Sequence, residues 1–123
     1  MASFTLKKKF TFEAAHYLPN HPGKCRRLHG HSWVGWAEVE GDRLHDNGAE
    51  SGMVMDFSCL GEAIKPLVEA YLDHYLLNET LELQSPTSEA IAEWIFHRLR
   101  GTGLPISAVT IEETCTSVCT YRN

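Results

Sequence analysis

The sequence predicts an α+β fold in which one antiparallel four-stranded sheet packs against two helices, in the order β-β-α-α-β-β. Alternation of apolar and polar residues near the start, broken once at Lys8, is typical of a half-buried strand. Two central stretches instead place apolar residues at helical spacing, and two short strand-like stretches follow them. The six stretches are residues 4–14, 29–40, 60–71, 91–99, 107–114 and 118–121.

Local signals mark the ends of both predicted helices. Asp56 or Ser58 is suited to cap the first helix, and Pro66 should kink that helix or mark its weak point. The second helix is predicted to start at 85–87 with a proline in its first turn, and to stop at Gly101. Between the two helices, residues 78–86 should form a loop.

Length and composition bound the class of protein. The 123 residues predict a single domain over 1–123, and 43% hydrophobic content is ordinary for a globular chain. A net charge of −5 argues against nucleic acid as the partner. No apolar run approaches the ~20 residues that cross a bilayer, and no secretory signal follows the first lysines, so no membrane partner is expected. Four cysteines without a pairing pattern are interpreted as free thiols, which favours a cytoplasmic location.

Three of the seven histidines lie close together in the sequence, at His16, His29 and His31. Residues i and i+2 of a strand point the same way, so His29 and His31 can converge on one ion, and His16 on the paired strand could join them. Three imidazoles suit zinc and leave a coordination position open for substrate or water. The competing interpretation is that these are ordinary surface or core histidines.

Cys25 lies four residues before His29, between Lys24 and the pair Arg26-Arg27. Adjacent cations favour the thiolate form of a cysteine. The thiol could therefore be a nucleophile or a base, a fourth zinc ligand, or an incidental cysteine in a solvated basic loop.

Two acidic positions also draw attention. Asp73 beside His74 could form a proton relay, although neighbours on a helix do not face each other; a histidine that complements the helix dipole is an equal alternative. Glu113 ends an apolar row with Val109 and Ile111, where a carboxylate must be paired or used. Such a carboxylate suits a heterocycle with two adjacent N–H donors, and the alternative is a strand-end side chain in solvent.

Trp33 and Trp36 fall on opposite faces of the second predicted strand. Two helices cover only one face of a four-stranded sheet, so a neighbouring subunit would cover the other. We therefore expect a homo-oligomer, the alternative being one tryptophan left exposed or covered by a loop.

Five segments together resemble the 6-pyruvoyl-tetrahydropterin synthase family over nearly the whole chain. The three residues between Cys25 and His29 resemble its bacterial branch, which makes 6-carboxy-5,6,7,8-tetrahydropterin. The matching segments are FTFEAAH at 10–16, CRRLHGH at 25–31, LDHYLLN at 72–78, SPTSE at 85–89 and EETCTSVCTYR at 112–122.

The resemblance implies a tunnelling fold in which three subunits close a barrel and two trimers stack, with active sites between subunits. It implies zinc as cofactor and Cys25 as general base. The remaining roles are a relay, a pterin anchor that could also help the relay, and a ring pocket. By position, the resemblance assigns His16, His29 and His31 to the metal, Asp73 and His74 to the relay, Glu113 to the anchor, and Thr87, Ser88 and Glu89 to the pocket.

The resemblance further implies a lyase acting on a small pterin, 7,8-dihydroneopterin triphosphate. The bacterial branch gives 6-carboxytetrahydropterin, acetaldehyde and triphosphate, on the route to queuosine and other 7-deazapurines. Two rivals stay open. One is the same fold making 6-pyruvoyl-tetrahydropterin, and the other is a non-catalytic module that binds zinc or a pterin.

Overall fold

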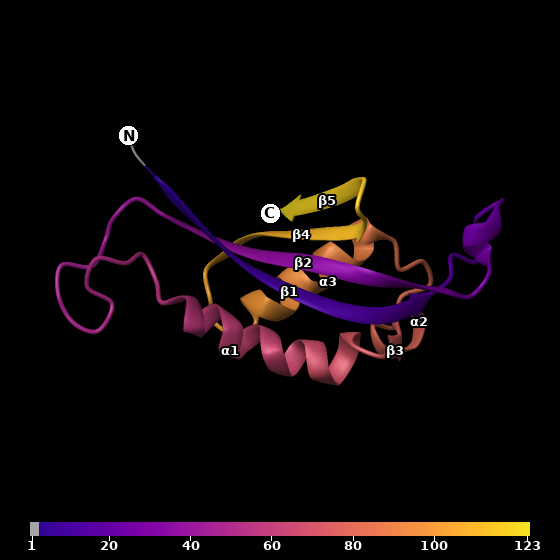
Figure 1. Cartoon of the computed structure of the whole chain (residues 1–123), viewed down its shortest axis with the longest axis horizontal. Helices are drawn as coiled ribbons and strands as arrows, with labels where there is room; N and C mark the ends of the chain where they lie inside the picture. The colour runs from indigo at the N-terminus through magenta and orange to yellow at the C-terminus, as the bar shows by residue number, and fades with distance from the viewer. Residues whose placement is uncertain (1–2) are drawn as a thin grey trace.

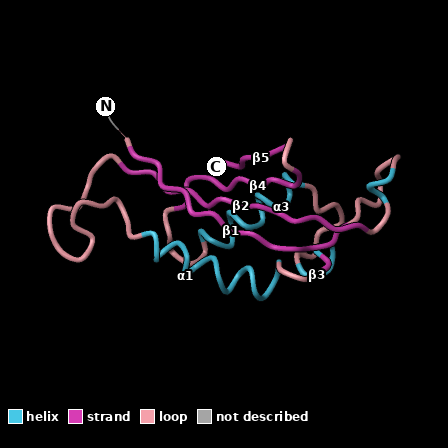
Figure 2. The backbone as a smooth tube through the Cα atoms, viewed as in Figure 1, coloured by secondary structure: helices cyan, strands magenta, loops and turns pink. Residues whose placement is uncertain are grey.

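The computed structural model, which describes residues 3–123, consists of one sheet with helices packed against it (Figure 1). The strands are ordered β3-β1-β2-β4-β5, and the four longer ones pair antiparallel. Figure 2 separates the strands from the long loops at the two ends of the sheet. The strands are β1 (Phe4–His16), β2 (His29–Gly41), β3 (Tyr75–Leu76), β4 (Ile106–Thr114) and β5 (Ser117–Arg122).

The prediction of four strands is corrected by β3, a two-residue strand that pairs parallel with Ala14 and Ala15 of β1. Periodicity cannot reveal so short a strand. It forms because the chain leaves the preceding helical segment alongside β1, where the His74 N–H donates to the carbonyl of Glu13 at 2.6 Å. The sheet therefore has five strands and is mostly antiparallel.

The register of the β1–β2 pair follows the period-two pattern of the sequence. Phe12 lies opposite Trp33, and His16 lies opposite His29. Phe12 and Trp33 are buried, and their rings stack with centroids 5.8 Å apart. The apolar row of β1 thus packs into the core and ends at His16, which places a polar side chain at the edge of that core.

The first helical segment is α1 (Phe57–Leu67), followed by a wider π-type turn, η2 (Val68–Leu72). The Asp56 carboxylate accepts from the Ser58 N–H at 2.9 Å, so Asp56 is the cap. Pro66 lacks an N–H, and the hydrogen-bond pattern widens just beyond it, which agrees with a weak point there. A short helix, α2 (Leu77–Thr80), follows in the region predicted as loop.

The second main helix, α3 (Ser88–Arg100), begins one turn later than predicted. Thr87 is its cap, since the Thr87 hydroxyl accepts from the Ala90 N–H at 3.1 Å. Pro86 therefore precedes the cap instead of lying in the first turn. This position leaves the Pro86 carbonyl free to contact β1. Within residues 3–123, no helix is long and apolar enough to cross a membrane.

The helices contribute to a core on one face of the sheet, and the other face carries mostly polar side chains. Trp33 is fully buried in that core, whereas Trp36 lies half-buried on the helix-free face, where its indole N–H donates to Glu112 at 2.7 Å. The two tryptophans thus point to opposite faces, as their spacing predicts. A short 3₁₀ turn, η1 (Lys24–Arg26), lies in the loop between β1 and β2.

Candidate active site

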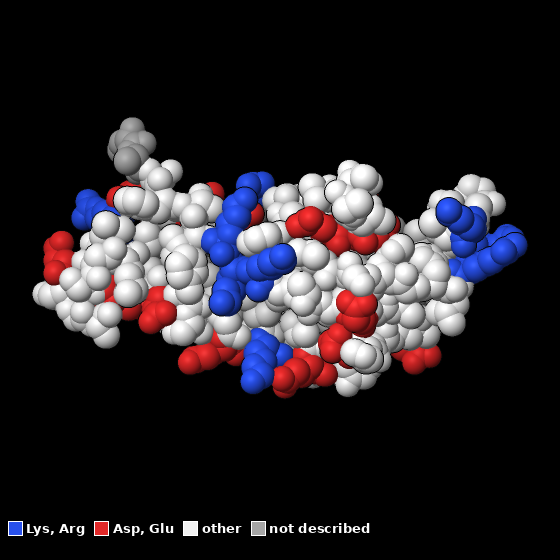
Figure 3. Space-filling view, viewed as in Figure 1, with Lys and Arg blue, Asp and Glu red and all other residues white. Residues whose placement is uncertain are grey.

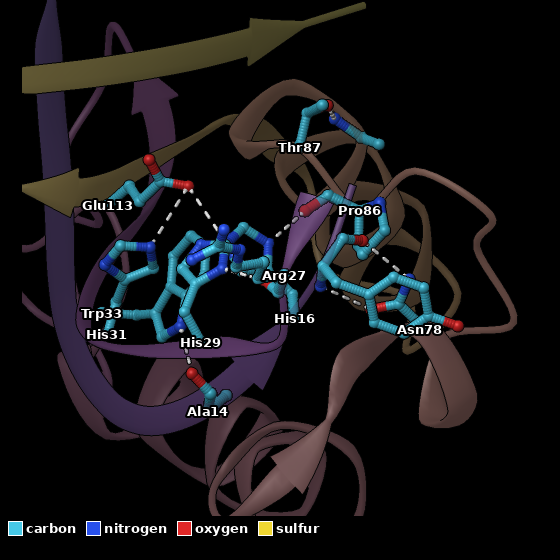
Figure 4. Close-up of polar contacts among 12 residues, drawn as sticks. Ala14, His16, Arg27, His29, His31, Trp33, Asn78, Pro86, Thr87 and Glu113 are labelled. Carbon is cyan, nitrogen blue, oxygen red and sulfur yellow. Dashed lines mark hydrogen bonds and ion pairs between the residues drawn. The ribbon is translucent and has the colours of Figure 1, made fainter. Parts of the chain in front are cut away.

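The three predicted histidines converge at one end of the sheet (Figure 4). One nitrogen of each of His16, His29 and His31 lies within 4.8 Å of the other two. His16 is fully buried, and the other two are partly exposed. The antiparallel register creates this cluster, because it sets His16 opposite His29 while His31 shares the face of His29.

Backbone carbonyls hold two of the rings in one orientation. The His16 Nδ1 lies 2.8 Å from the carbonyl oxygen of Pro86, and the His29 Nδ1 lies 2.7 Å from that of Arg27. A carbonyl accepts only, so each Nδ1 carries the proton and donates it. In a neutral ring the Nε2 then keeps a free lone pair, which is the form that binds a metal ion.

Glu113 completes the polar cluster. Its Oε1 lies 3.5 Å from the His16 Nε2 and 3.9 Å from the His31 Nε2. An irregularity in the β4–β5 pairing between Glu112 and Thr114 leaves Glu113 outside the ladder. Glu113 turns to the core face and Glu112 to the other, so the apolar row with Val109 and Ile111 ends in a carboxylate at the imidazoles.

The charge states of this cluster fit a bound cation. Burial lowers the pKa of both His16 and His31, against the attraction of Glu113, so both rings are neutral at neutral pH. The Nε2 atoms of both are buried without a hydrogen-bond partner among the described residues. The lone pair of the His16 Nε2 faces the Glu113 carboxylate and repels it unless a positive charge lies between them. Three imidazole nitrogens form a donor set that suits zinc, and one coordination position would stay open.

Trp33 forms the floor of the site. It packs edge-on against His16 and His31, with ring centroids 5.0 and 5.2 Å away, and its indole N–H donates to the Ala14 carbonyl at 3.1 Å. The orienting roles of Trp33, Pro86 and the Arg27 carbonyl are not evident from the sequence. Only the place of Pro86 in the SPTSE segment hints at its part.

Cys25 lies in η1, a few residues before His29, and its thiol is free and partly buried. The carbonyl of Cys25 accepts from the Leu18 N–H at 2.9 Å, which folds the turn back on the start of the loop. Among the described residues, Cys25 is not part of the three-nitrogen cluster.

Asp73 and His74 form a pair in a way that the helical prediction did not anticipate. They follow η2 instead of lying within it, and His74 adopts a left-handed backbone conformation with φ of 68°. This turn lets the His74 Nδ1 approach the Asp73 Oδ2 to 2.9 Å. The other oxygen of Asp73 accepts from the Glu13 N–H at 2.9 Å. Asp73 thus orients His74 and anchors it to β1.

His74 and His31 border the same hollow of about 510 Å³. Glu13 and Ser32, which are joined by a 2.6 Å hydrogen bond, also line it. Glu13 and Ser32 point to the opposite face from Ala14 and His31. Cys25 does not line this hollow, so within residues 3–123 the structure does not place His74 next to Cys25.

Thr87, Ser88 and Glu89 lie at the start of α3, close in sequence to the Pro86 carbonyl that holds His16. The Thr87 hydroxyl is engaged as the helix cap. Glu89 is exposed in the first turn. Asn78 braces this region against β1, because its side chain bonds both the N–H and the carbonyl of Tyr17, at 3.1 and 2.9 Å.

Comparison with known proteins adds the family. The model of the family described as 6-pyruvoyl tetrahydropterin synthase matches residues 5–123. The chain belongs to this family.

Individual relatives match over most of their length. A 6-carboxy-5,6,7,8-tetrahydropterin synthase of Synechocystis sp. is 58% identical over 93% of this chain and 89% of that protein. A protein of the same name from Haemophilus influenzae is 36% identical over 97% of this chain and 99% of its own. The structure of Caenorhabditis elegans 6-pyruvoyl tetrahydropterin synthase is similar with a TM-score of 0.84 and 28% identity, covering 100% of this chain and 97% of that one.

Proposed function

We propose that the chain is a zinc-dependent 6-carboxy-5,6,7,8-tetrahydropterin synthase. It would convert 7,8-dihydroneopterin triphosphate to 6-carboxytetrahydropterin, acetaldehyde and triphosphate in the route to queuosine. The observation that carries the proposal is the 58% identity with the Synechocystis protein of that name, which extends over 93% of the chain. The three-imidazole cluster supplies the matching chemistry. The free state of all four cysteines supports a cytoplasmic location.

His16, His29 and His31 would hold the zinc ion through their Nε2 atoms. Bound zinc supplies a Lewis acid that draws electron density from the substrate's side-chain hydroxyls and makes the neighbouring C–H bond acidic. Cys25 would move that proton as general base. Departure of triphosphate, addition of one water molecule, which supplies the second carboxyl oxygen, and loss of the two terminal carbons as acetaldehyde would complete the conversion.

Glu113 would anchor the pterin ring. A carboxylate accepts two parallel N–H bonds from an amidine-like edge, and Glu113 is only partly exposed, so water competes weakly for it. The nearby start of α3 offers Thr87, Ser88 and Glu89 as further contacts for the ring. The Thr87 side chain is already engaged as the helix cap, which favours its backbone as the contacting group.

The proposed relay requires a neighbouring subunit, and the proposed barrel would supply it. Asp73 and His74 would serve the Cys25 of a neighbouring copy, since the Cys25 of their own chain does not line the hollow that His74 borders. Two unpaired strand edges support such an assembly. β1 pairs with β3 only at Ala14 and Ala15, and β5 pairs only with β4 among the described strands. Joining β1 of one subunit to β5 of the next would remove both edges and close a ring, as a trimer or a dimer of trimers.

One assay tests the reaction itself. The zinc-loaded protein is incubated with 7,8-dihydroneopterin triphosphate, and the products are identified by mass spectrometry. Release of acetaldehyde with the 6-carboxy product is the expected result. The similarity to the Caenorhabditis elegans structure favours a second candidate, 6-pyruvoyl-tetrahydropterin synthase, for which the terminal carbons would stay on the product and no acetaldehyde would appear.

A Cys25→Ala variant separates the roles of the thiol. As general base, Cys25 contributes about 10²–10⁴-fold in rate, so turnover should fall by that factor while zinc stays bound. Cys115→Ala, which removes an exposed thiol in the turn before β5, is the matched control. Loss of zinc from Cys25→Ala would instead identify a fourth ligand. Equal turnover by wild type and variant would favour a non-catalytic zinc- or pterin-binding module.

A further inference from the structure

A cluster of positive charge lies in the loop that leads into His29. Lys24, Arg26 and Arg27 fall within four residues, although the chain as a whole carries a net charge of −5. Figure 3 shows blue side chains gathered at the end of the molecule where Figure 1 places the loop that contains η1. All three side chains are exposed.

These three cations have no carboxylate partner within residues 3–123. The six ion pairs of the described structure involve other residues, so the charges stay available to a ligand. Concentrated like charges that no carboxylate offsets repel one another, and a bound anion would relieve that cost.

The turn that carries them is held in shape. The Arg27 N–H donates to the Lys24 carbonyl at 3.0 Å, and the Arg26 N–H donates to that of Gly23 at 3.3 Å. The bond between Leu18 and Cys25 ties the turn to the start of the loop. The cations are thus presented from a hydrogen-bonded segment, which lowers the entropy cost of binding.

The position of the turn relative to the site decides what it can bind. The Arg27 carbonyl contacts the His29 ring, whereas Glu113 contacts His16 and His31. The basic turn and the proposed ring anchor therefore border different members of the histidine cluster. A substrate whose ring lies at Glu113 and whose hydroxyls lie at the imidazoles would extend its charged tail toward the turn.

We infer that Lys24, Arg26 and Arg27 form a polyphosphate-binding subsite, which holds the triphosphate of the substrate beside Cys25 and, in this role, rests on the proposed function. Guanidinium groups bind phosphate oxygens in pairs, and the lysine adds a point charge. Holding the tail also fixes the carbon skeleton next to the thiol that would move its proton. The cations then contribute to substrate binding and to the departure of triphosphate as an anion.

The test compares ligands with and without phosphate, in the Cys25→Ala background so that no turnover occurs. Three single variants are tested: Arg26→Gln, Arg27→Gln and Lys24→Gln. Each should raise the dissociation constant for 7,8-dihydroneopterin triphosphate about tenfold, which is the effect of losing one charge-assisted hydrogen bond. Binding of 7,8-dihydroneopterin, which has no phosphate, should change less than about twofold. Arg43→Gln, an exposed cation in the loop after β2, is the matched control and should leave both affinities unchanged.

Binding of inorganic tripolyphosphate tests the subsite without a pterin ligand. Calorimetry measures its affinity for the protein, and zinc content is monitored because this anion chelates metals. The affinity should fall in the same three variants and recover in Arg26→Lys. If the pterins do not bind at all, the proposed function fails while this measurement still tests the subsite. Unchanged tripolyphosphate binding in all three variants would overturn the inference. A lower native mass of the variants together with unchanged tripolyphosphate affinity would also overturn the inference, because the cations would then belong to a subunit interface.

Discussion

At the residue scale, the site depends on how neighbouring groups fix each imidazole. The Pro86 and Arg27 carbonyls hold the Nδ1 atoms of two rings, and burial keeps His16 and His31 neutral. Glu113 adds negative charge beside the free lone pair of His16 and close to the Nε2 of His31. A divalent cation is the group that all of these features favour together.

We expect the purified protein to contain about one zinc per subunit, and His29→Ala or His31→Ala to lose most of it. Both rings are partly exposed, so the fold should persist, as circular dichroism would show. His45→Ala, in the exposed loop after β2, is the control and should keep its zinc. Full zinc content in both site variants would show that the ligands are misassigned.

Glu113→Gln should weaken pterin binding more than it lowers zinc content. An amide offers one acceptor and one mismatched donor where the carboxylate offers two acceptors, and a charge-assisted bond contributes ~1.5–3 kcal/mol. The Michaelis constant should therefore rise by at least about tenfold. Metal analysis of the same sample separates the two effects, and an unchanged Michaelis constant with unchanged turnover would remove Glu113 from the site.

At the element scale, the chain joins distant segments through a few short contacts. Asp73 and His74 connect the end of η2 to β1 through Glu13, whose N–H donates to Asp73 and whose carbonyl accepts from His74. Close packing also joins β1 to β2. The ring of Phe10 in β1 occupies the space that a side chain at position 35 of β2 would need.

Asp73 should make the free energy of unfolding depend on pH. The Glu13 N–H, and then the His74 side chain, lower the pKa of Asp73. A carboxyl whose pKa is lowered on folding stabilises the protein above its unfolded pKa, and that contribution is lost as the pH falls. The difference in unfolding free energy between wild type and Asp73→Asn should narrow as the pH drops below about 4.

Urea titrations at a series of pH values measure this difference. Asp46→Asn, in the loop after β2, controls for the loss of one negative charge. If the difference in unfolding free energy between wild type and Asp73→Asn stays constant across the pH series, the Asp73 carboxylate does not make stability depend on pH.

The same glycine-to-alanine change should have opposite effects in two elements. At Gly35 of β2, a Cβ would lie 2.2 Å from the Phe10 ring, so Gly35→Ala should cost roughly 1–3 kcal/mol through overpacking. In α1 a Cβ at Gly61 would approach only the Lys8 side chain, at 3.6 Å, so Gly61→Ala should stabilise by up to about 1 kcal/mol. Thermal unfolding compares both variants, and a stabilising Gly35→Ala would contradict the packing described.

At the scale of the whole molecule, the sheet leaves two edges and one face without cover from its own helices. β5 carries the exposed apolar side chain of Val118, and most of β1 lacks a strand partner on the side away from β2. Edges of this kind are normally blocked or paired. The site shares this incompleteness, because among the described residues Cys25 does not line the hollow that His74 borders.

The native mass should therefore be three or six times 13.9 kDa. Val118→Asp places a charge on the open edge and should shift the mass toward the monomer, whereas Asn47→Asp, in an exposed loop, should not. Light scattering coupled to size exclusion measures both. A wild-type protein that stays monomeric at micromolar concentration would contradict the closed ring.

Much of the fold and of the histidine cluster could be predicted from the sequence, because both depend on local periodicity. Side chains alternate along a strand whatever lies around it, so the apolar row of β1 and the shared face of His29 and His31 follow from spacing alone. The capping of α1 by Asp56 and the weak point at Pro66 are local in the same sense. The two-residue β3 and the position of Pro86 before the α3 cap were not predicted, because each depends on contacts with another segment.

The tertiary structure alone decided which groups meet. The carbonyl that orients His16 lies 70 residues away in the sequence, and Glu113 reaches the imidazoles through an irregular pairing between β4 and β5. The left-handed turn at His74 brings its ring to the Asp73 carboxylate. Spacing determines where a side chain points from its own strand, whereas the packing of distant segments determines which carbonyl, carboxylate or neighbouring subunit it faces.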